Sequence, residues 1–247
     1  MTGKRRKIFL IISVMLLFLA VMVYFFQFNS YGYLMTVPCR PAFTEIADHV
    51  YINKSNAREH QEILDLIERA EERVRAFFGD LRFSDETIFV ICDDERLTRK
   101  LGEDHATVTI SFPFEKHYIC ISDEYLDLDI LAHEITHAEL RARLTARAQG
   151  KIPAWFDEGL AVQNDYRERY GEEQWIAQTG NGERIVALED MDTPAEFYAG
   201  TAEDRRFRYL NAKHELGIWM ALHGQQGLLE LIENLNGGAD FNTVYNR

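Results

Sequence analysis

The chain has 247 residues, of which 47% are hydrophobic and 12% aromatic, and this composition excludes an intrinsically disordered protein. Its 40 acidic residues outnumber 27 basic ones, and the net charge of -13 argues against nucleic acid as a partner, because the phosphates would be repelled. The length is that of one domain or two and is sufficient to bury a sizeable core.

The first predicted element is an apolar helix at the N-terminus. Four consecutive basic residues, 4–7, precede a run from 8 to 28 in which Ser13 and Gln27 are the clearly polar side chains. A helix of that length spans about 31 Å, the thickness of a bilayer core. A cleaved signal peptide is the alternative, but the run ends in large aromatics where a cleavage site needs small residues. We therefore expect residues 1–30 to be an uncleaved signal anchor.

The membrane topology follows from the charges beside this helix. Basic residues favour the cytoplasmic side, so the N-terminus is expected there. Residues 31–247 are then expected to form an extracytoplasmic domain, and the protein would be a single-pass membrane protein.

The first part of this domain reads as a connecting segment, a helix and strands. Residues 31–50 contain Pro38 and Pro41 and are expected to connect the anchor to the domain. A helix is predicted over 56–78, where apolar residues recur at helical spacing before a glycine. β-branched and aromatic runs predict strands at 87–92, near 106–111 and at 117–122, with a turn at Pro113.

Three cysteines leave the redox state open. Cys92 and Cys120 each lie in a predicted strand, so they fit either a disulfide, which an extracytoplasmic location would allow, or two buried thiols. Cys39 has no evident partner in the sequence.

Helical periodicity dominates the second half of the chain. Helices are predicted over 128–149 and 153–166, and then over 203–222 and 225–236. Strands followed by helices indicate an α+β domain, as opposed to a sheet built from βαβ units.

The helix predicted over 128–149 carries His133-Glu134-Ile135-Thr136-His137. Histidines four residues apart project from one helix face, so their ring nitrogens can converge on one cation. The glutamate between them can then accept a proton from a metal-bound water. The pattern predicts a metal site in which His133 and His137 are ligands and Glu134 is the general base.

A catalytic zinc site needs a third protein ligand. An arrangement with a glycine and then a third histidine further along the same stretch is excluded, because Leu140 and Arg143 occupy those two offsets. Glu158 on the next predicted helix is the expected ligand, and Asp157 is the second candidate. Gly159 is small and is expected to let this helix approach the first one closely.

The segments Leu-Ala-His-Glu-Ile-Thr-His-Ala (131–138) and Pro-Ala-Trp-Phe-Asp-Glu-Gly-Leu-Ala (153–161) together resemble the gluzincin metallopeptidases, specifically the peptidase MA-like group. The resemblance implies a zincin-like fold: a small, mostly antiparallel sheet over an active-site helix, with a helical C-terminal half. It also implies that a peptide substrate lies along an edge strand, for which 117–122 is the candidate. By the same resemblance Tyr209 would stabilise the oxyanion, although an ordinary core tyrosine is equally consistent with the sequence.

The predicted function is a membrane-anchored zinc metallopeptidase that hydrolyses peptide bonds of a peptide or protein substrate with a metal-activated water. The alternative is a catalytically inactive zincin-like domain that serves as a tethered binding or scaffold module. An intramembrane protease is excluded by the cost of burying charge in hydrocarbon. The charged residues around the two histidines are Asp127, Asp129, Glu139, Arg141 and Arg143.

The remaining histidines have no partner at ligand spacing, and packing or solvent exposure is expected for them. They are His49, His60, His105, His117, His214 and His223.

Overall fold

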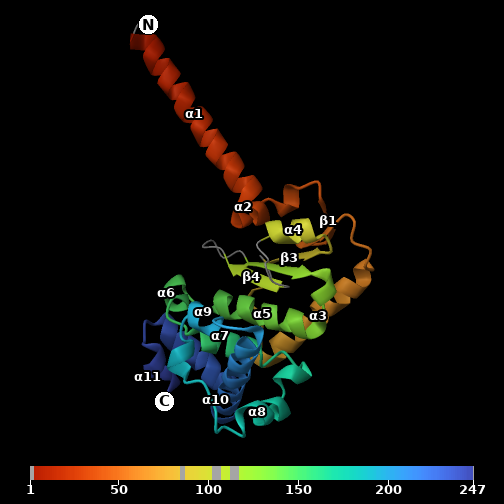
Figure 1. Cartoon of the computed structure of the whole chain (residues 1–247), viewed down its shortest axis with the longest axis vertical. Helices are drawn as coiled ribbons and strands as arrows, with labels where there is room; N and C mark the ends of the chain where they lie inside the picture. The colour runs from red at the N-terminus through yellow and green to blue at the C-terminus, as the bar shows by residue number, and fades with distance from the viewer. Residues whose placement is uncertain (1–2, 84–86, 102–106, 112–116, 247) are drawn as a thin grey trace.

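The computed structural model describes residues 3–83, 87–101, 107–111 and 117–246, without the side chains of residues 3–6, 108 and 111. In Figure 1 the long helix α1 (Gly3–Phe28) projects away from the rest of the chain. A sheet follows next to its base, and the helical C-terminal half lies at the far end.

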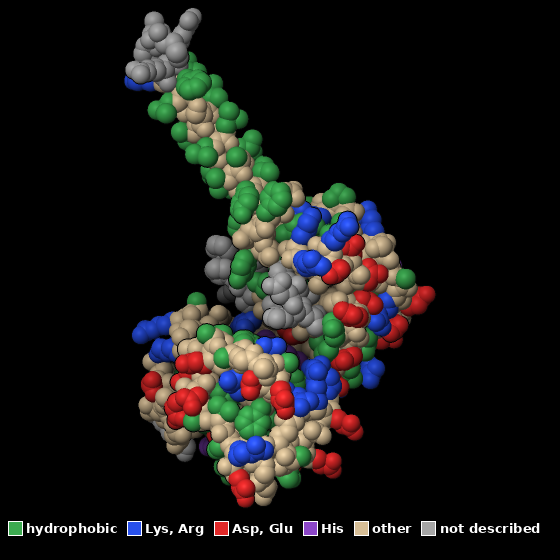
Figure 2. Space-filling view, viewed as in Figure 1, with side chains coloured by type: hydrophobic (Ala, Val, Ile, Leu, Met, Phe, Trp, Pro, Cys, Tyr) green, Lys and Arg blue, Asp and Glu red, His purple; other side chains and the backbone are tan. Residues whose placement is uncertain are grey.

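Helix α1 is the element predicted at the N-terminus. Among the described residues, Lys7–Phe28 forms a helix long and apolar enough to span a membrane, with a mean hydropathy of 3.0 and no buried side chain in its most apolar stretch. Figure 2 shows hydrophobic side chains covering it, whereas charges of both signs are mixed over the rest of the visible face. Arg40, which follows α2 (Ser30–Met35) and η1 (Val37–Cys39), donates to the main-chain oxygen of Tyr33 and holds this connection together.

The described strands form a five-stranded sheet in the order β1-β2-β3-β5-β4. Their bounds are β1 (Phe43–Ala47), β2 (Val50–Asn53), β3 (Thr87–Cys92), β4 (Thr107–Ser111) and β5 (His117–Ser122). The strands predicted at 87–92, near 106–111 and at 117–122 are thereby confirmed. β1 lies within the segment 31–50 that was expected to be a connection, and β2 lies where no strand was predicted. The turn predicted at Pro113 and the histidine His105 lie outside the described residues.

The sheet is mixed, and the prediction of a mostly antiparallel sheet was wrong. β1–β2 and β4–β5 pair antiparallel, but β2–β3 and β3–β5 pair parallel. The chain passes from β2 through the crossover helix α3 (His60–Phe78) to β3, which is a βαβ unit of the kind that was not expected. Because β5 pairs with β3, the expected edge strand 117–122 is interior, and β4 is the edge beside it.

Each face of the sheet has its own core. Phe89, Ile91 and Ile119 point to the face that packs on α3 and the helical half. Alternate positions point to the other face, covered by α2 and η1, and these include Cys92 and Cys120. The structure holds both cysteines as buried thiols, in strands where Cys120 pairs with Val90 and not with Cys92. Burial on both faces explains why β3 reads as a continuous apolar run.

The helical half follows β5, as predicted. Its larger helices are α5 (Leu128–Arg143), α7 (Ala154–Ala161), α8 (Glu172–Thr179) and α10 (Ala202–Asn236). The shorter elements of this half are η3 (Asp123–Tyr125), α6 (Ala146–Gln149), η4 (Glu168–Tyr170), η5 (Leu188–Met191), α9 (Pro194–Phe197) and the C-terminal α11 (Phe241–Tyr245). A further short helix, α4 (Glu95–Lys100), lies between β3 and β4.

Two breaks interrupt the helices of the second half of the chain. The helix expected over 128–149 is divided at Leu144, whose extended backbone ends α5 before Thr145 caps α6. α10 contains a break at Gly224, with φ 62° and ψ -169°, a conformation available essentially to glycine alone. This break separates the two helices predicted over 203–222 and 225–236.

Candidate metal centre

Helix α5 carries three of the predicted site residues on one face. Its first turn is capped by Asp127, whose carboxylate accepts a hydrogen bond of 2.7 Å from the main-chain N–H of Ile130. The opposite face is anchored in the core by Leu131 and Ile135, which are fully buried. His133, Glu134 and His137 therefore project from a rigid helix into a cavity of about 940 Å³.

Glu158 reaches the same cavity from α7. Phe156 on this helix packs edge-on against Phe241 and Tyr245, which fixes the helix in the core. The close approach that Gly159 permits is to α10 and not to α5 as expected, since a Cβ atom there would lie 2.9 Å from the main-chain oxygen of Ala212. A larger side chain would push α7 away from α10 and displace the carboxylate of Glu158.

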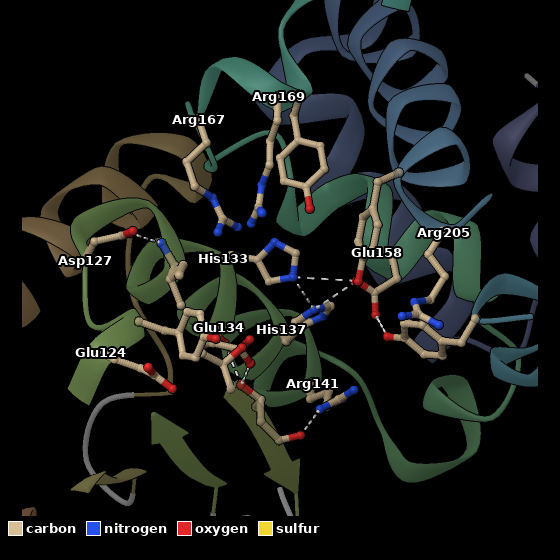
Figure 3. A pocket seen from close by; sticks show the side chains of 17 residues that line it. Glu124, Asp127, His133, Glu134, His137, Arg141, Glu158, Arg167, Arg169 and Arg205 are labelled. Carbon is tan, nitrogen blue, oxygen red and sulfur yellow. Dashed lines mark hydrogen bonds and ion pairs between the residues drawn. The ribbon is translucent and has the colours of Figure 1, made fainter. Parts of the chain in front are cut away.

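His133, His137 and Glu158 form a buried group that could hold a metal ion. The two Nε2 atoms are 3.2 Å apart, and Oε2 of Glu158 lies 3.6 Å from Nε2 of His133 and 3.5 Å from Nε2 of His137. Metal–ligand bonds of about 2.0–2.2 Å in a tetrahedron would place the ligand atoms about 3.3–3.6 Å apart. Figure 3 shows the three side chains pointing toward one another. Their spacing fits a small tetrahedral cation.

Oε2 of Glu158 is a buried atom with no hydrogen-bond partner among the described residues. An unpaired carboxylate oxygen in this position is costly, because it has lost its hydration. It faces two ring nitrogens at distances too long for hydrogen bonds. A cation bound among the three atoms would satisfy all of them.

A carboxylate lies behind each of the two histidines. Oδ1 of Asp157 is 2.6 Å from Nδ1 of His137, so Nδ1–H donates to this carboxylate, and a cation at the centre would take the place of any proton on Nε2. Oδ2 of the fully buried Asp165 lies 4.0 Å from Nδ1 of His133. Asp157, the second candidate for the third ligand, thus contacts the far side of a histidine and is not part of the metal-binding group.

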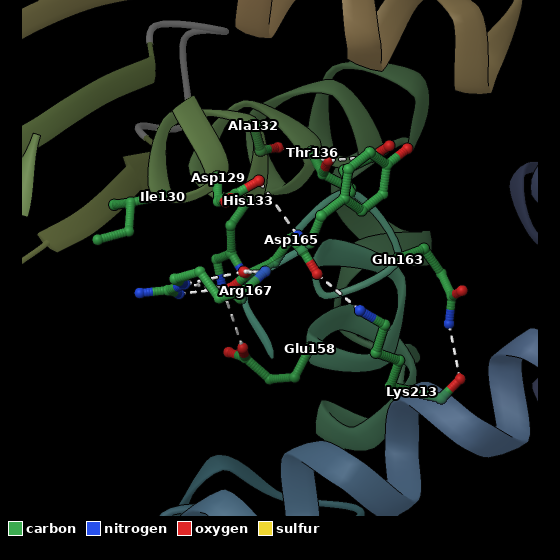
Figure 4. A network of polar contacts seen from close by, with 12 residues as sticks. Asp129, Ile130, Ala132, His133, Thr136, Glu158, Gln163, Asp165, Arg167 and Lys213 are labelled. Atoms are coloured by element: carbon green, nitrogen blue, oxygen red, sulfur yellow. Dashed lines mark hydrogen bonds and ion pairs between the residues drawn. The ribbon is translucent and has the colours of Figure 1, made fainter. Parts of the chain in front are cut away.

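The two outer carboxylates have cationic partners of their own. Arg141 donates to Asp157 at 3.3 Å, and Nε of Arg167 donates to Asp165 at 2.8 Å. Figure 4 shows Asp165 between Arg167 and His133, with Lys213 donating to its main-chain oxygen. These contacts neutralise the outer carboxylates and fix their positions.

The electrostatics of the group already favour a bound cation. Burial alone would raise the pKa of Glu158, but His137 and His133 hold this pKa well below its usual range. Burial alone would lower the pKa of His137, but Asp157 and Glu158 together raise it well above its usual value. The carboxylates therefore supply a negative field at the centre of the group.

Glu134 is buried and lines the cavity, but it is not among the three clustered ligand atoms. Its Oε2 accepts a hydrogen bond of 2.6 Å from the hydroxyl of Thr109 on the edge strand β4. Arg141 donates to the main-chain oxygen of Thr109 at 3.0 Å, so β4 and α5 are joined beside the site. This arrangement leaves Glu134 held at the cavity wall.

Three tyrosines line the cavity on the side of the C-terminal helices, namely Tyr170, Tyr198 and Tyr209. The ring of Tyr209, the residue singled out from the sequence, has its centroid 6.1 Å from that of His133. Burial and the negative charge of Glu158 raise the pKa of Tyr209, so its hydroxyl keeps its proton. Tyr198 donates a short hydrogen bond to Oε1 of Glu158.

No family model matches the chain, and a search of curated proteins finds no match either.

Several residues around the site were not predicted from the sequence. Tyr198 follows the four-residue helix α9 and Asp165 lies in a loop after α7, and neither stands in a periodic pattern that would indicate its role. The remaining described histidines do not line this cavity. His214 stacks on Trp175 and His223 stacks on Trp219, which is the packing expected for them.

Proposed function

We propose that this chain is a membrane-anchored zinc peptidase of the gluzincin kind, with His133, His137 and Glu158 as metal ligands. The observation that carries the proposal is the triangle of ligand atoms with edges of 3.2, 3.5 and 3.6 Å, together with the carboxylate of Glu134 in the same cavity. Two imidazoles and one carboxylate are a donor set typical of catalytic zinc, which keeps a fourth position open.

Zinc in such a site would lower the pKa of water and polarise a substrate carbonyl. The residues of the chain supply the rest of the chemistry. Glu134 accepts the proton of the attacking water and delivers it to the leaving amine. The protonated hydroxyl of Tyr209 donates a hydrogen bond to the oxygen that becomes negative in the transition state. Tyr198 holds the carboxylate of Glu158 in its orientation.

The edge strand β4 is the surface along which we expect the substrate to lie. Its described partner in the sheet is β5, so its other side is not paired within the described strands. Thr107 and Thr109 of this strand line the cavity. An extended peptide added to such an edge would pass next to Glu134 and the metal group.

The orientation across the membrane is part of the proposal. The basic residues before α1 favour a cytoplasmic N-terminus and an extracytoplasmic peptidase domain. Protease added to intact cells should remove a C-terminal tag and spare an N-terminal one. The opposite pattern of protection would place the domain in the cytoplasm.

The metal-dependent activity is tested on the full-length protein in detergent. Metal analysis should find one zinc per chain, and a chelator should abolish hydrolysis of a mixed peptide library until zinc is restored. His133→Ala and His137→Ala should lose both zinc and activity, because each removes one of three ligands. Full zinc occupancy in either variant would overturn the ligand assignment.

A further inference from the structure

The cavity wall that the structure describes carries four arginines, although the chain has a net charge of -13. Two of them have partners within the site. Arg141 pairs with Asp157, and Arg167 pairs with Asp165. These two arginines are accounted for by the carboxylates behind the histidines.

Arg169 and Arg205 have no such partner. Neither guanidinium lies within 4.0 Å of a described carboxylate in an ion pair. Arg205 donates to the main-chain oxygen of Gly200 at a long 3.4 Å, and Arg169 lies 5.0 Å from the ring centroid of Tyr170. Most of the hydrogen-bonding capacity of both guanidinium groups is therefore unused within the described protein; the half-buried Arg205 lines the cavity, and Arg169 lines it at an exposed position.

The charges are also separated across the cavity. In Figure 3 Arg205 lies beyond Glu158, and Arg167 and Arg169 reach toward His133 from above. Glu124 and Asp127 lie on the other side of His133. The carboxylate of Asp127 caps α5 and acts on Arg167, and that of Glu124 is exposed; among the described ion pairs, neither of them joins Arg169 or Arg205. The cavity thus has a basic side and an acidic side.

We infer that the cavity takes peptides that carry a carboxylate close to the bond to be cleaved, and that Arg169 and Arg205 bind this carboxylate. The inference rests on the proposed peptidase function. A guanidinium offers paired N–H donors that match the two oxygens of a carboxylate, and the bond strengthens in a partly enclosed site. The carboxylate is either an acidic side chain or the C-terminus of the substrate.

The test measures peptide binding by the full-length, zinc-loaded protein with Glu134→Gln, in which hydrolysis is blocked. Four fluorescent peptides share one neutral core: one is amidated, one has a free C-terminus, one is amidated and contains Glu, and one is amidated and contains Lys. A carboxylate-bearing peptide should bind about tenfold more tightly than the neutral amide. Preference for the free C-terminus or for Glu identifies the source of the carboxylate.

Arg169→Gln combined with Arg205→Gln should abolish this preference. Arg206→Gln is the matched control, because Arg206 is an exposed neighbour on α10 that does not line the cavity. Equal binding of all four peptides, or a preference that survives the double substitution, would overturn the inference.

Hydrolysis by the wild-type protein is measured separately, so that the two proposals fail in different ways. Cleavage of all four peptides at equal rates overturns carboxylate selection and leaves the peptidase intact. Tight, arginine-dependent binding of a carboxylate peptide without cleavage of any peptide overturns the peptidase and leaves carboxylate recognition intact.

Discussion

Oδ1 of Asp157 lies 2.6 Å from Nδ1 of His137, although the two residues are on different helices. The next residue, Glu158, approaches the opposite nitrogen of the same ring. One turn of α7 therefore supplies both a proposed metal ligand and the group that sets the tautomer of another.

Asp157→Asn should weaken zinc binding 10- to 100-fold without removing a ligand, because an amide stabilises the imidazole less well than a carboxylate does. Competition with a chelator of known affinity measures the change. Asp190→Asn, at an exposed position outside the cavity, is the control. Unchanged zinc affinity in Asp157→Asn would show that the contact does not support the metal site.

Tyr198 and Tyr209 are expected to do different work. Tyr198→Phe removes the hydrogen bond to Oε1 of Glu158, so zinc affinity should fall about tenfold. Tyr209→Phe should retain zinc and lower kcat about 100-fold, because a donor to the transition state is lost. Zinc titration and steady-state kinetics on both variants, with exposed Tyr166→Phe as control, separate the roles. An unaltered kcat in Tyr209→Phe would show that Tyr209 does not stabilise the transition state and only packs in the core.

Glu139 and Arg143 form a buried ion pair one turn beyond the histidines on α5. Nε of Arg143 donates to Oε1 of Glu139 at 2.5 Å, and Oε2 accepts from the main-chain N–H groups of Arg82 and Phe83. Glu139→Ala should destabilise the fold by about 3 kcal/mol, because it breaks the buried ion pair and leaves the N–H groups of Arg82 and Phe83 without their acceptor, although Asp80 still pairs with Arg143. Urea unfolding followed by tryptophan fluorescence measures this loss.

Replacing both partners with leucine should recover much of that stability, since no buried charge remains. A double variant as unstable as Glu139→Ala would mean that the contacts to the loop before β3 matter more than the charge.

His117 predicts a pH-dependent stability. Burial, helped by Arg141, lowers its pKa to about 4, whereas an unfolded histidine titrates near 6.5. Between these pH values the unfolded chain binds a proton at His117 that the folded chain does not. The contribution of His117 to the free energy of unfolding is therefore fully present above about pH 6.5 and is lost as the pH decreases. The loss approaches about 3 kcal/mol at pH 4. His117→Gln should flatten the slope of unfolding free energy against pH, and an unchanged slope would assign it to other groups.

The sequence predicted the local features of this protein better than its strand pairing. Spacing along one helix determines that His133 and His137 share a face, so the structure brings them together as expected. The pairing of β3 with β5 depends on contacts between distant segments, and the apolar runs of both strands do not indicate which neighbour they take. Burial on both faces is typical of parallel strands, but a continuous apolar run in the sequence predicts only that a strand is present.

The residues that surround the three proposed ligands could not be predicted from the sequence, for the same reason. Asp165 and Tyr198 approach the group formed by His133, His137 and Glu158 only because α7 packs on both α5 and α10. Glu158 could be anticipated because it stands on the helix that follows the two histidines. Its hydrogen bond from Tyr198, a residue forty positions later, could not.

The central claim is that Glu134 performs the proton transfer while His133, His137 and Glu158 hold the metal. The most direct test measures zinc per chain and peptide turnover together in full-length Glu134→Gln and wild-type protein. An amide keeps the shape of the side chain but cannot accept the proton, so the variant should bind one zinc and lose at least about 100-fold in kcat. Wild-type turnover in Glu134→Gln, or a wild-type protein that neither binds zinc nor cleaves peptides, would contradict the account.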